Sequence, residues 1–253
     1  MDHVHFRFHG DLNDLLRPDR RNVDIVYPLS SPSSVKHPIE ALGVPHTEVD
    51  LILANRRPVG FEYPLLGQDF IDLFPPGHAM TAGQPMILRP PLPRPVRFVV
   101  DTHLGQLASY LRLLGFDTWY RNDFDDPELA RISSNQARLL LTRDRGLLKR
   151  GIVVYGYCVR STDPRRQLID LLVRYQLAPS AQPWSRCVRC NGLLLSVDKA
   201  EIIERLQPLT RLYYDEFRQC QDCGQIFWQG SHYQRTRCFV DDLLAEVKEM
   251  EQA

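Results

Sequence analysis

Apolar and polar residues alternate at the two-residue period of a β-strand in several segments of the first 76 residues. This pattern predicts four strands, at residues 4–8, 23–27, 49–53 and 69–74. Between the second and third strands, Ser33 and Ser34 are candidate N-caps for a short helix that ends near Gly43. Two strands, a helix and two more strands predict a small α+β domain.

From residue 96 onward, predicted strands alternate with predicted helices. Apolar runs predict strands at residues 96–100, 117–120, 139–142 and 152–155. Leucines recur at helical spacing over residues 104–114, and Gly115 is a candidate stop. Asp125-Asp126-Pro127-Glu128 and Asp163-Pro164 have the composition of helix starts. This order predicts an α/β domain with a parallel sheet and helices on both faces, in which ligands bind outside the carboxyl ends of the strands.

Residues 89–95 contain four prolines in seven residues, which predicts an extended linker. The predicted organisation is therefore an α+β domain at residues 1–88, the linker at 89–95, an α/β domain at 96–180, a cysteine-containing module at 181–240 and a C-terminal tail or helix at 241–253.

Apolar residues form 43% of the chain and charged residues 25%, which is typical of a globular protein. The chain has no apolar run long enough to predict a membrane span, and its N-terminus lacks the pattern of a secretory signal. We therefore expect a soluble, cytoplasmic protein without a membrane partner. The 31 basic and 31 acidic residues cancel, so that only local charge is informative.

Aspartates follow the predicted strands or begin the predicted helices, at Asp101, Asp125, Asp126, Asp144 and Asp163. A parallel sheet brings such residues to one edge from separate segments. Carboxylates that lie close together repel one another and favour a hard divalent cation, Mg²⁺ or Mn²⁺. Such ions activate water for phosphodiester hydrolysis. Alternatively, each aspartate is only a helix N-cap, which stabilises a helix by about 1 kcal/mol.

Basic residues gather around these acids. Between Arg138 and Arg166 the chain carries eight basic residues and two acidic ones. Such a cluster predicts contacts with the phosphates of a nucleic acid, and a solvated surface is the alternative. The candidate RNA-binding residues are Arg143, Arg145, Lys149 and Arg150.

Several motifs resemble, in the same order, those of the Mut-seven C-terminal family of PIN-like ribonucleases, over most of residues 96–235. They include Asp101-Thr102-His103-Leu104-Gly105-Gln106-Leu107-Ala108, Asp125-Asp126-Pro127-Glu128-Leu129, Leu140-Leu141-Thr142-Arg143-Asp144-Arg145 and Arg160-Ser161-Thr162-Asp163-Pro164. The resemblance implies a PIN-like fold in which the catalytic metal is held by Asp101, Asp125 (or Asp126) and Asp144, with Asp163 as a fourth acid. Residues 103–115 lack the acid that PIN nucleases often carry in the first helix.

The first domain resembles ubiquitin-like sulfur carriers at residues 46–59, which implies a β-grasp fold for residues 1–88. Such carriers react through a free Gly-Gly C-terminus, and here the chain continues into the proline-rich linker without such a pair. We therefore expect a binding or regulatory role with a protein partner. A role as an interaction module in sulfur-carrier pathways is an alternative.

All six cysteines lie in the second half of the chain. Four of them form two C-x₂-C motifs separated by 29 residues, at Cys187, Cys190, Cys220 and Cys223. Two such pairs predict a tetrahedral Cys₄ zinc ribbon, and a shell of four protein ligands makes the zinc structural. Disulfides are disfavoured in a reducing cytoplasm, and a thioredoxin-type motif is not doubled in this way.

These features predict a metal-dependent ribonuclease that hydrolyses RNA phosphodiester bonds at a strand-end cluster of carboxylates. The alternative is a non-catalytic RNA-binding adaptor that uses the zinc ribbon and the basic surface.

Overall fold

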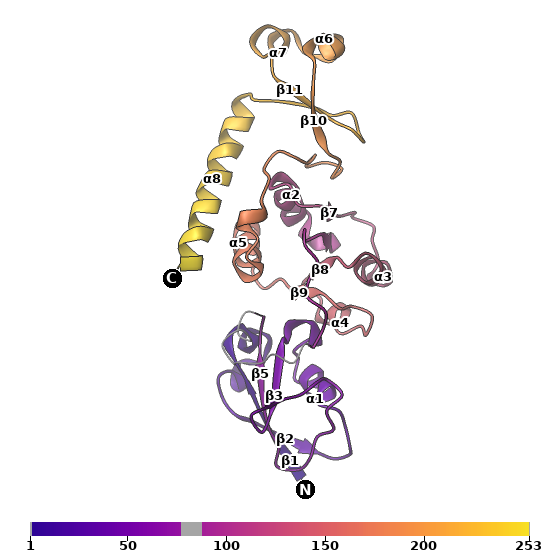
Figure 1. Ribbon diagram of the computed structural model, residues 1–253, viewed down its shortest axis with the longest axis vertical. Helices are drawn as coiled ribbons and strands as arrows, with labels where there is room; N and C mark the ends of the chain where they lie inside the picture. Colours follow the sequence, from indigo (N-terminus) through magenta and orange to yellow (C-terminus); the bar gives the residue numbers. More distant parts are fainter. Residues whose placement is uncertain (1, 77–87, 253) are drawn as a thin grey trace. The chain divides into compact units, whose positions relative to one another are not determined.

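The computed structural model describes residues 2–76 and 88–252 of the chain (Figure 1). The chain divides into two compact units. The N-terminal unit comprises residues 1–94 and 123–160, and the C-terminal unit comprises residues 95–122 and 161–253. Each unit has its own strands and its own buried apolar residues.

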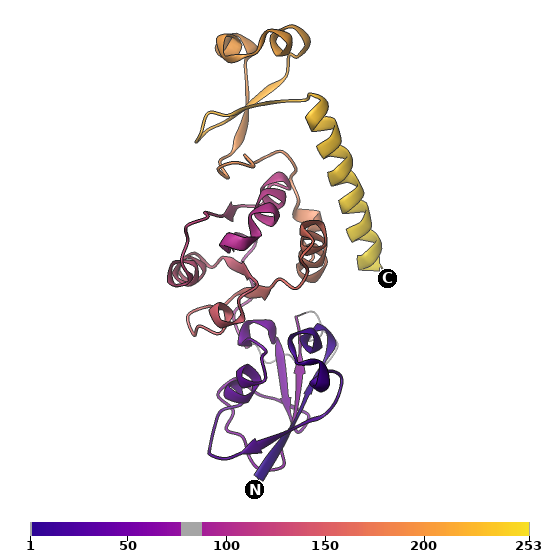
Figure 2. The same ribbon diagram turned by 180° about the vertical axis from the view of Figure 1, so that it is seen from behind.

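The N-terminal unit contains a five-stranded sheet. Its strands are β1 (Asp2–Phe8), β2 (Ile25–Leu29), β3 (Leu51–Ala54), β4 (Arg57–Pro58) and β5 (Phe70–Phe74). They are ordered β2-β1-β5-β3-β4, with β1 and β5 parallel and the other pairs antiparallel. The connections contain α1 (Lys36–Ala41) and the 3₁₀ helices η1 (Gly10–Leu15), η2 (Pro18–Arg20) and η3 (His46–Glu48). Figure 2 shows the sheet and α1 from behind. The predicted β-grasp fold is confirmed.

The start of helix α1 differs from the prediction. The helix begins at Lys36 after Val35, and no side chain caps it, so that the predicted cap by Ser33 or Ser34 is wrong. Ser34 instead pairs with Pro64 in an isolated β-bridge. Ser34 still contributes to the helix start through its backbone, because its carbonyl oxygen accepts from His37 N–H at 3.2 Å.

The N-terminal unit also contains a parallel strand pair from the second half of the chain. Its elements are α3 (Asp126–Gln136), β8 (Leu139–Thr142), α4 (Arg145–Leu148) and β9 (Gly156–Cys158). β8 and β9 are parallel, as predicted. The predicted strand at residues 152–155 is wrong. Pairing with β8 begins only at Tyr155, whose carbonyl oxygen accepts from Leu140 N–H, and the strand itself is β9 at Gly156–Cys158. Val153 and Tyr155 are buried, and this burial accounts for the apolar pattern without a strand.

The C-terminal unit contains a second parallel strand pair, β6 (Phe98–Val100) and β7 (Thr118–Trp119). Its helical elements are η5 (Thr102–Leu104), α2 (Gly105–Leu113), α5 (Pro164–Tyr175) and η6 (Ala178–Ser180). The helix stop predicted at Gly115 is confirmed, since this residue has a φ of +87°. A Cβ at this position would lie 2.2 Å from the carbonyl oxygen of Gln182, so that only glycine fits.

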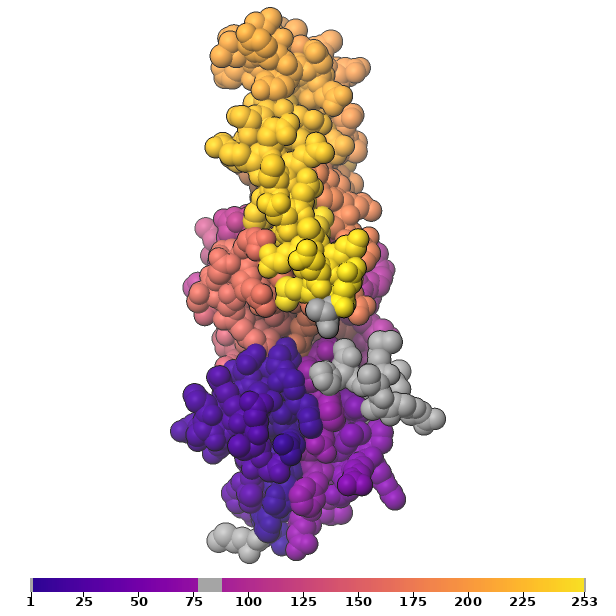
Figure 3. Space-filling model, turned by 90° about the vertical axis from the view of Figure 1, so that its left-hand side faces the viewer, coloured from indigo at the N-terminus to yellow at the C-terminus, as the bar shows by residue number. Residues whose placement is uncertain are grey.

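A small antiparallel sheet and a long helix complete the C-terminal unit. The sheet order is β10 (Leu194–Val197), β11 (Phe217–Cys220) and β12 (Ile226–Trp228), and α6 (Lys199–Ile202), η7 (Ile203–Arg205) and α7 (Pro208–Tyr213) connect β10 to β11. Helix α8 (Ser231–Gln252) runs beside α5 (Figures 1 and 2). It buries Val240, Leu243 and Val247, and its opposite side is exposed to solvent (Figure 3). An ion pair of 2.6 Å joins Glu246 to Arg165 of α5.

In the part of the chain that the structure describes, none of the helices combines the length and the apolar character needed to cross a bilayer.

Candidate functional site

Asp101 directly follows β6, at the position where the sequence predicts a catalytic acid. It is the N-cap of η5, and its Oδ1 accepts from the backbone N–H of Thr102 at 2.6 Å and from Thr102 Oγ1 at 3.2 Å. Only 8% of Asp101 is exposed. A carboxylate buried to this extent is normally paired or hydrogen-bonded, and the contacts from Thr102 meet part of that need.

The other predicted acids also stand at helix N-termini, and most of them are exposed. Asp125 caps α3 by accepting from Glu128 N–H at 2.7 Å, and Asp126 is the first residue of that helix. Asp163 caps α5 by accepting from Arg166 N–H at 2.7 Å. The predicted helix starts at Asp125 and Asp163 are therefore confirmed.

Asp144 follows β8 and caps α4. Its Oδ1 accepts from Gly146 N–H at 2.6 Å, while its own N–H donates to Thr142 Oγ1 at 2.9 Å. Asp101, Asp125, Asp144 and Asp163 thus each use Oδ1 to cap a helix. Capping stabilises a helix by about 1 kcal/mol at such positions. Asparagine caps as well as aspartate does, so capping does not explain why each of these residues is an aspartate.

The acids are distributed over both units of the fold. Asp125, Asp126 and Asp144 belong to the N-terminal unit, and Asp101 and Asp163 belong to the C-terminal unit. Each of Asp101 and Asp144 lies at the carboxyl end of a strand from a parallel pair, as predicted.

The four basic residues predicted to bind RNA fall into two kinds. Arg143, Arg145 and Arg150 are exposed and Lys149 is half-buried, but Arg145 and Lys149 also make hydrogen bonds to carbonyl oxygens. Arg145 donates from Nη1 to the carbonyl oxygen of Leu15 at 2.6 Å, and Lys149 donates from Nζ to the carbonyl oxygen of Glu40 at 2.6 Å. The second kind therefore contacts the β-grasp domain.

The four predicted zinc ligands come together. The ligand atoms of Cys187, Cys190, Cys220 and Cys223 all lie within 4.8 Å of one another. The Sγ atoms of Cys190 and Cys220 are 3.3 Å apart, and those of Cys187 and Cys223 are 3.8 Å apart. Two tight turns produce this arrangement, with Asn191 N–H donating to Cys187 O at 2.9 Å and Gly224 N–H donating to Cys220 O at 3.0 Å. Asn191 and Gly224 have φ angles of +77° and +69°. This cluster and the antiparallel β10-β11-β12 sheet are consistent with a zinc ribbon.

The thiols of this cluster differ strongly in acidity. Burial raises the pKa of Cys190 to about 12, with hydrogen bonds from neighbouring thiols adding to the shift. The backbone N–H of Gln225 lowers the pKa of Cys223 to about 7. Four thiolates at these separations repel one another, and a bound cation relieves this repulsion. A closed set of four sulfur ligands fits Zn²⁺.

Arg112 of α2 joins the zinc ribbon to the strand pair of the same unit, and the sequence pattern did not reveal it. Only 5% of this residue is exposed. Its guanidinium donates to four backbone carbonyls, those of Thr118, Tyr120, Val188 and Arg189, at 3.0–3.3 Å. The last two carbonyls lie inside the first C-x₂-C turn. The only signal in the sequence was an arginine beside the apolar stripe of a helix.

Asn191, directly after the first C-x₂-C motif, makes a second connection between the ribbon and β7. Its Oδ1 accepts from Thr118 N–H at 2.9 Å, and its Nδ2 donates to Asp117 Oδ1 at 2.8 Å. The ribbon of the C-terminal unit is therefore attached to the parallel strand pair by specific polar contacts as well as by the chain.

The fold and the cysteine cluster define a protein with a β-grasp domain, a parallel α/β region and a ribbon with a four-cysteine metal site. A family model for the Mut7-C RNAse domain matches residues 96–240, and a model for the Mut7-C ubiquitin domain matches residues 1–81. The first match covers more than half of the chain, and the protein belongs to the Mut7-C RNAse domain family. Comparisons with curated proteins and with solved structures found no match.

The resemblance predicted from the motifs is thereby confirmed, for the ribonuclease region and for the N-terminal ubiquitin-like domain. The RNAse domain supports a ribonuclease-type function with RNA as substrate, and the ubiquitin-like domain suggests a protein interaction.

Proposed function

We propose that this protein is a metal-dependent ribonuclease that hydrolyses RNA phosphodiester bonds. The observation that carries the proposal is the match of the RNAse family model to residues 96–240. This range contains every acid selected from the sequence, and each of them lies at a strand end or a helix start.

Asp101, Asp125 and Asp144 are the proposed ligands of the catalytic Mg²⁺ or Mn²⁺, with Asp126 and Asp163 as further acids. Carboxylate oxygens suit these hard cations. The ions would neutralise charge on the phosphate and activate water for attack. In each of these three ligands, one oxygen is held by a helix N–H, which orients the carboxylate and leaves Oδ2 without a role in the cap.

Arg143 and Arg150 are the proposed phosphate contacts next to Asp144. Both are exposed, and both flank the short segment that contains α4. A guanidinium matches the geometry of a phosphate with two parallel donors. We propose that these residues hold the RNA backbone, whereas Arg145 and Lys149 already donate to backbone carbonyls of the ubiquitin-like domain.

Zn²⁺ is the proposed occupant of the cysteine cluster, in a structural role. The small core of the ribbon, formed by Ile202, Leu206, Phe217 and Ile226, is too limited to fold the module by itself. Cytoplasm is the proposed location, because a cluster of four unpaired thiols is compatible with a reducing compartment.

Substitution of Asp144 by asparagine tests the catalytic proposal without removing the helix cap. Asparagine caps helices as well as aspartate does, yet it carries no charge for a metal. We expect Asp144→Asn to lose Mn²⁺-dependent RNA cleavage while its thermal unfolding stays close to that of the wild type. Equal cleavage by wild type and Asp144→Asn would refute the assignment of this carboxylate.

The non-catalytic RNA-binding adaptor is the second candidate function, and two observations favour it. Four of the five acids each use one carboxylate oxygen as a helix cap, which is a structural role. Helix α2 carries no acidic side chain that could complete a metal site. An adaptor would bind RNA with an affinity that falls as salt rises, and it would cut no RNA when Mn²⁺ is added.

A further inference from the structure

The ubiquitin-like domain is in close contact with the segment that follows Asp144. Strand β9 packs against η3, and Arg145, Lys149 and Arg160 donate hydrogen bonds to η1 and the end of α1, all within the N-terminal unit. This contact joins residues separated by about one hundred positions or more in the chain.

Glu48 of η3 lies at the centre of the contact and is fully buried. Its Oε1 accepts from the backbone N–H of Cys158 in β9 at 2.5 Å. Its Oε2 is paired with Nη2 of Arg160 at 3.1 Å. Burial of a carboxylate is costly unless the charge is paired and hydrogen-bonded, and both conditions are met here. The ion pair therefore specifies one arrangement of η3 against the end of β9.

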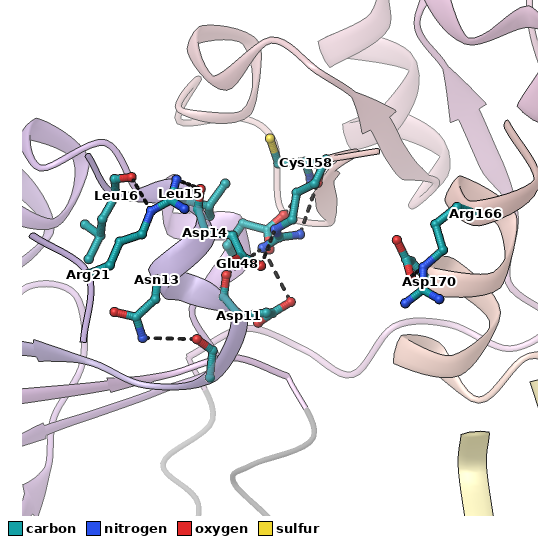
Figure 4. A network of polar contacts seen from close by, with 12 residues as sticks. Asp11, Asn13, Asp14, Leu15, Leu16, Arg21, Glu48, Cys158, Arg166 and Asp170 are labelled. Atoms are coloured by element: carbon teal, nitrogen blue, oxygen red, sulfur yellow. Dashed lines mark hydrogen bonds and ion pairs between the residues drawn. The ribbon is translucent and has the colours of Figure 1, made fainter. Parts of the chain in front are cut away.

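Arg160 connects the same strand end to a second element of the ubiquitin-like domain. Nη2 of Arg160 donates to the carbonyl oxygen of Asp11 at 3.3 Å and lies 3.4 Å from the Asp11 carboxylate. Its Nη1 donates to the carbonyl oxygen of Cys158 at 3.1 Å. Figure 4 shows Asp11 and Glu48 close together beside Cys158. One guanidinium thus links η1, η3 and β9.

Helix α4 is tied to the ubiquitin-like domain at both of its ends. Arg145, its first residue, donates to the carbonyl oxygen of Leu15, the last residue of η1. Lys149, its C-cap, donates to the carbonyl oxygen of Glu40 in the last turn of α1. The carbonyl oxygen of Glu40 also accepts from Gly43 N–H at 3.1 Å, and carbonyls at helix C-termini carry partial negative charge that favours a cationic donor.

The backbone of β9 and of the residues before it also lies close to side chains of η3. A Cβ at Gly156 would lie 3.2 Å from Oγ1 of Thr47 and 2.5 Å from Cδ2 of Leu148. Nearby, Nε2 of His46 donates to the carbonyl oxygen of Val153 at 3.0 Å. A side chain at position 156 would clash with Leu148 of α4 and press against Thr47 of η3, so that glycine suits this position.

We propose that the ubiquitin-like domain acts in cis as a positioning element of the ribonuclease, with Glu48 as its central residue. It holds α4 and the end of β9, and Asp144 immediately precedes α4. The catalytic part of this inference rests on the proposed function of Asp144. A second consequence is that Arg145 and Lys149 fasten the domain and do not contact RNA.

The first test compares Glu48→Gln with Glu62→Gln in the full chain. Glu62 is an exposed glutamate of the same domain and serves as the matched control. Hydrogen exchange is measured at residues 145–149 and 156–160. We expect Glu48→Gln to accelerate exchange there by about tenfold, the factor that corresponds to loss of one charge-assisted hydrogen bond. Equal exchange in the two variants would overturn the inference.

A cleavage assay on the same two variants separates positioning from mere stability. With RNA as substrate and Mn²⁺ present, Glu48→Gln should lower kcat more than it raises the KM for RNA, because catalysis needs Asp144 held in place whereas the long side chains of Arg143 and Arg150 can still reach a phosphate. A rise in KM with unchanged kcat would contradict the positioning role. If the wild type cuts no RNA, both the proposed ribonuclease function and the positioning of Asp144 for catalysis are refuted. The hydrogen-exchange result still tests whether the ubiquitin-like domain holds α4 and β9.

A milder pair of variants covers the case in which Glu48→Gln does not fold. Arg145→Ala and Arg143→Ala remove the arginines on either side of Asp144. Arg145 has a hydrogen bond to the ubiquitin-like domain, and the described residues show none for Arg143. RNA affinity is measured against salt concentration. We expect Arg143→Ala to reduce the salt slope by about one unit and Arg145→Ala to leave it unchanged while accelerating exchange in α4. A slope reduced by Arg145→Ala and normal exchange would overturn the docking role.

Discussion

At the scale of single residues, the aspartates that carry the proposed chemistry are also structural caps. The carboxylate of Asp144 accepts from Gly146 N–H, and that of Asp101 accepts from Thr102 N–H. A single oxygen fulfils the cap in each residue. The cap and the metal-binding role therefore make different demands on the side chain, since only metal binding requires the charge.

Asp144→Ala and Asp144→Asn separate these two demands in a stability measurement. Alanine removes the acceptor, and we expect the free energy of unfolding to fall by about 1 kcal/mol. Asparagine keeps the acceptor, and we expect a change of a few tenths of a kcal/mol. Urea denaturation of both variants measures the difference. Identical losses in the two variants would show that the carboxylate stabilises the fold through its charge.

Arg112 shows what residue patterns cannot reveal. Its position beside the apolar stripe of α2 gave no indication that it donates to the carbonyls of Val188 and Arg189, more than seventy residues away. Every residue has a backbone carbonyl, so the sequence does not show which carbonyl accepts a hydrogen bond from a distant side chain. By contrast, the caps at Asp125 and Asp163 were predictable because the donors lie within three residues.

Replacement of Arg112 by methionine tests its role in attaching the ribbon. The substitution leaves four carbonyl oxygens without this donor in a buried site, and we expect the free energy of unfolding to fall by about 3 kcal/mol. Arg131→Met on α3 is the control, because this side chain is exposed and makes one long hydrogen bond of 3.4 Å. Equal stability of the two variants in urea denaturation would show that Arg112 does not attach the ribbon.

At the scale of elements, predictions succeeded where local sequence determines the structure. β8 was predicted at its observed bounds, Leu139–Thr142. All four of its residues are buried, and this burial produces the short apolar run that is visible in the sequence. The strand predicted at residues 152–155 is instead β9 at Gly156–Cys158, since its position depends on pairing with β8 and on the approach of Thr47 to Gly156. The cysteine cluster was predictable because the spacing within each pair fixes a tight turn.

Removal of zinc should change the reactivity of the cysteine thiols. In the zinc-loaded protein we expect alkylation to modify the exposed Cys238 and to spare the four cluster cysteines, which are shielded as metal ligands. A chelator should add the four cluster cysteines to the modified set. Mass spectrometry of the alkylated protein counts them, and an unchanged count after chelation would contradict a metal in the cluster.

Cys158 provides an internal reference in the same experiment. Burial raises its pKa, so that its thiolate fraction at a given pH is smaller than that of an ordinary cysteine. Its alkylation should remain slow at pH 9 and become faster only at higher pH or after unfolding. Rapid modification of Cys158 at neutral pH would show that β9 is not packed as described.

At the scale of the whole molecule, the two family matches divide the chain differently from its compact units. The ubiquitin-like match ends at residue 81, whereas the N-terminal unit continues with residues 123–160. The contacts of Glu48, Arg145 and Lys149 account for this difference, because they attach part of the RNAse domain to the ubiquitin-like domain. Sequence patterns gave the two domains and could not give this attachment, which depends on residues distant in the chain.

The most direct test of the central claim is cleavage of a panel of labelled RNAs with and without Mn²⁺. The wild type is compared with the double variant Asp101→Asn/Asp144→Asn, in which both helix caps are retained. We expect Mn²⁺-dependent cutting by the wild type and none by the double variant. Equal cutting by both proteins, or intact RNA in every lane with binding retained, would contradict it, and the second result would identify an adaptor.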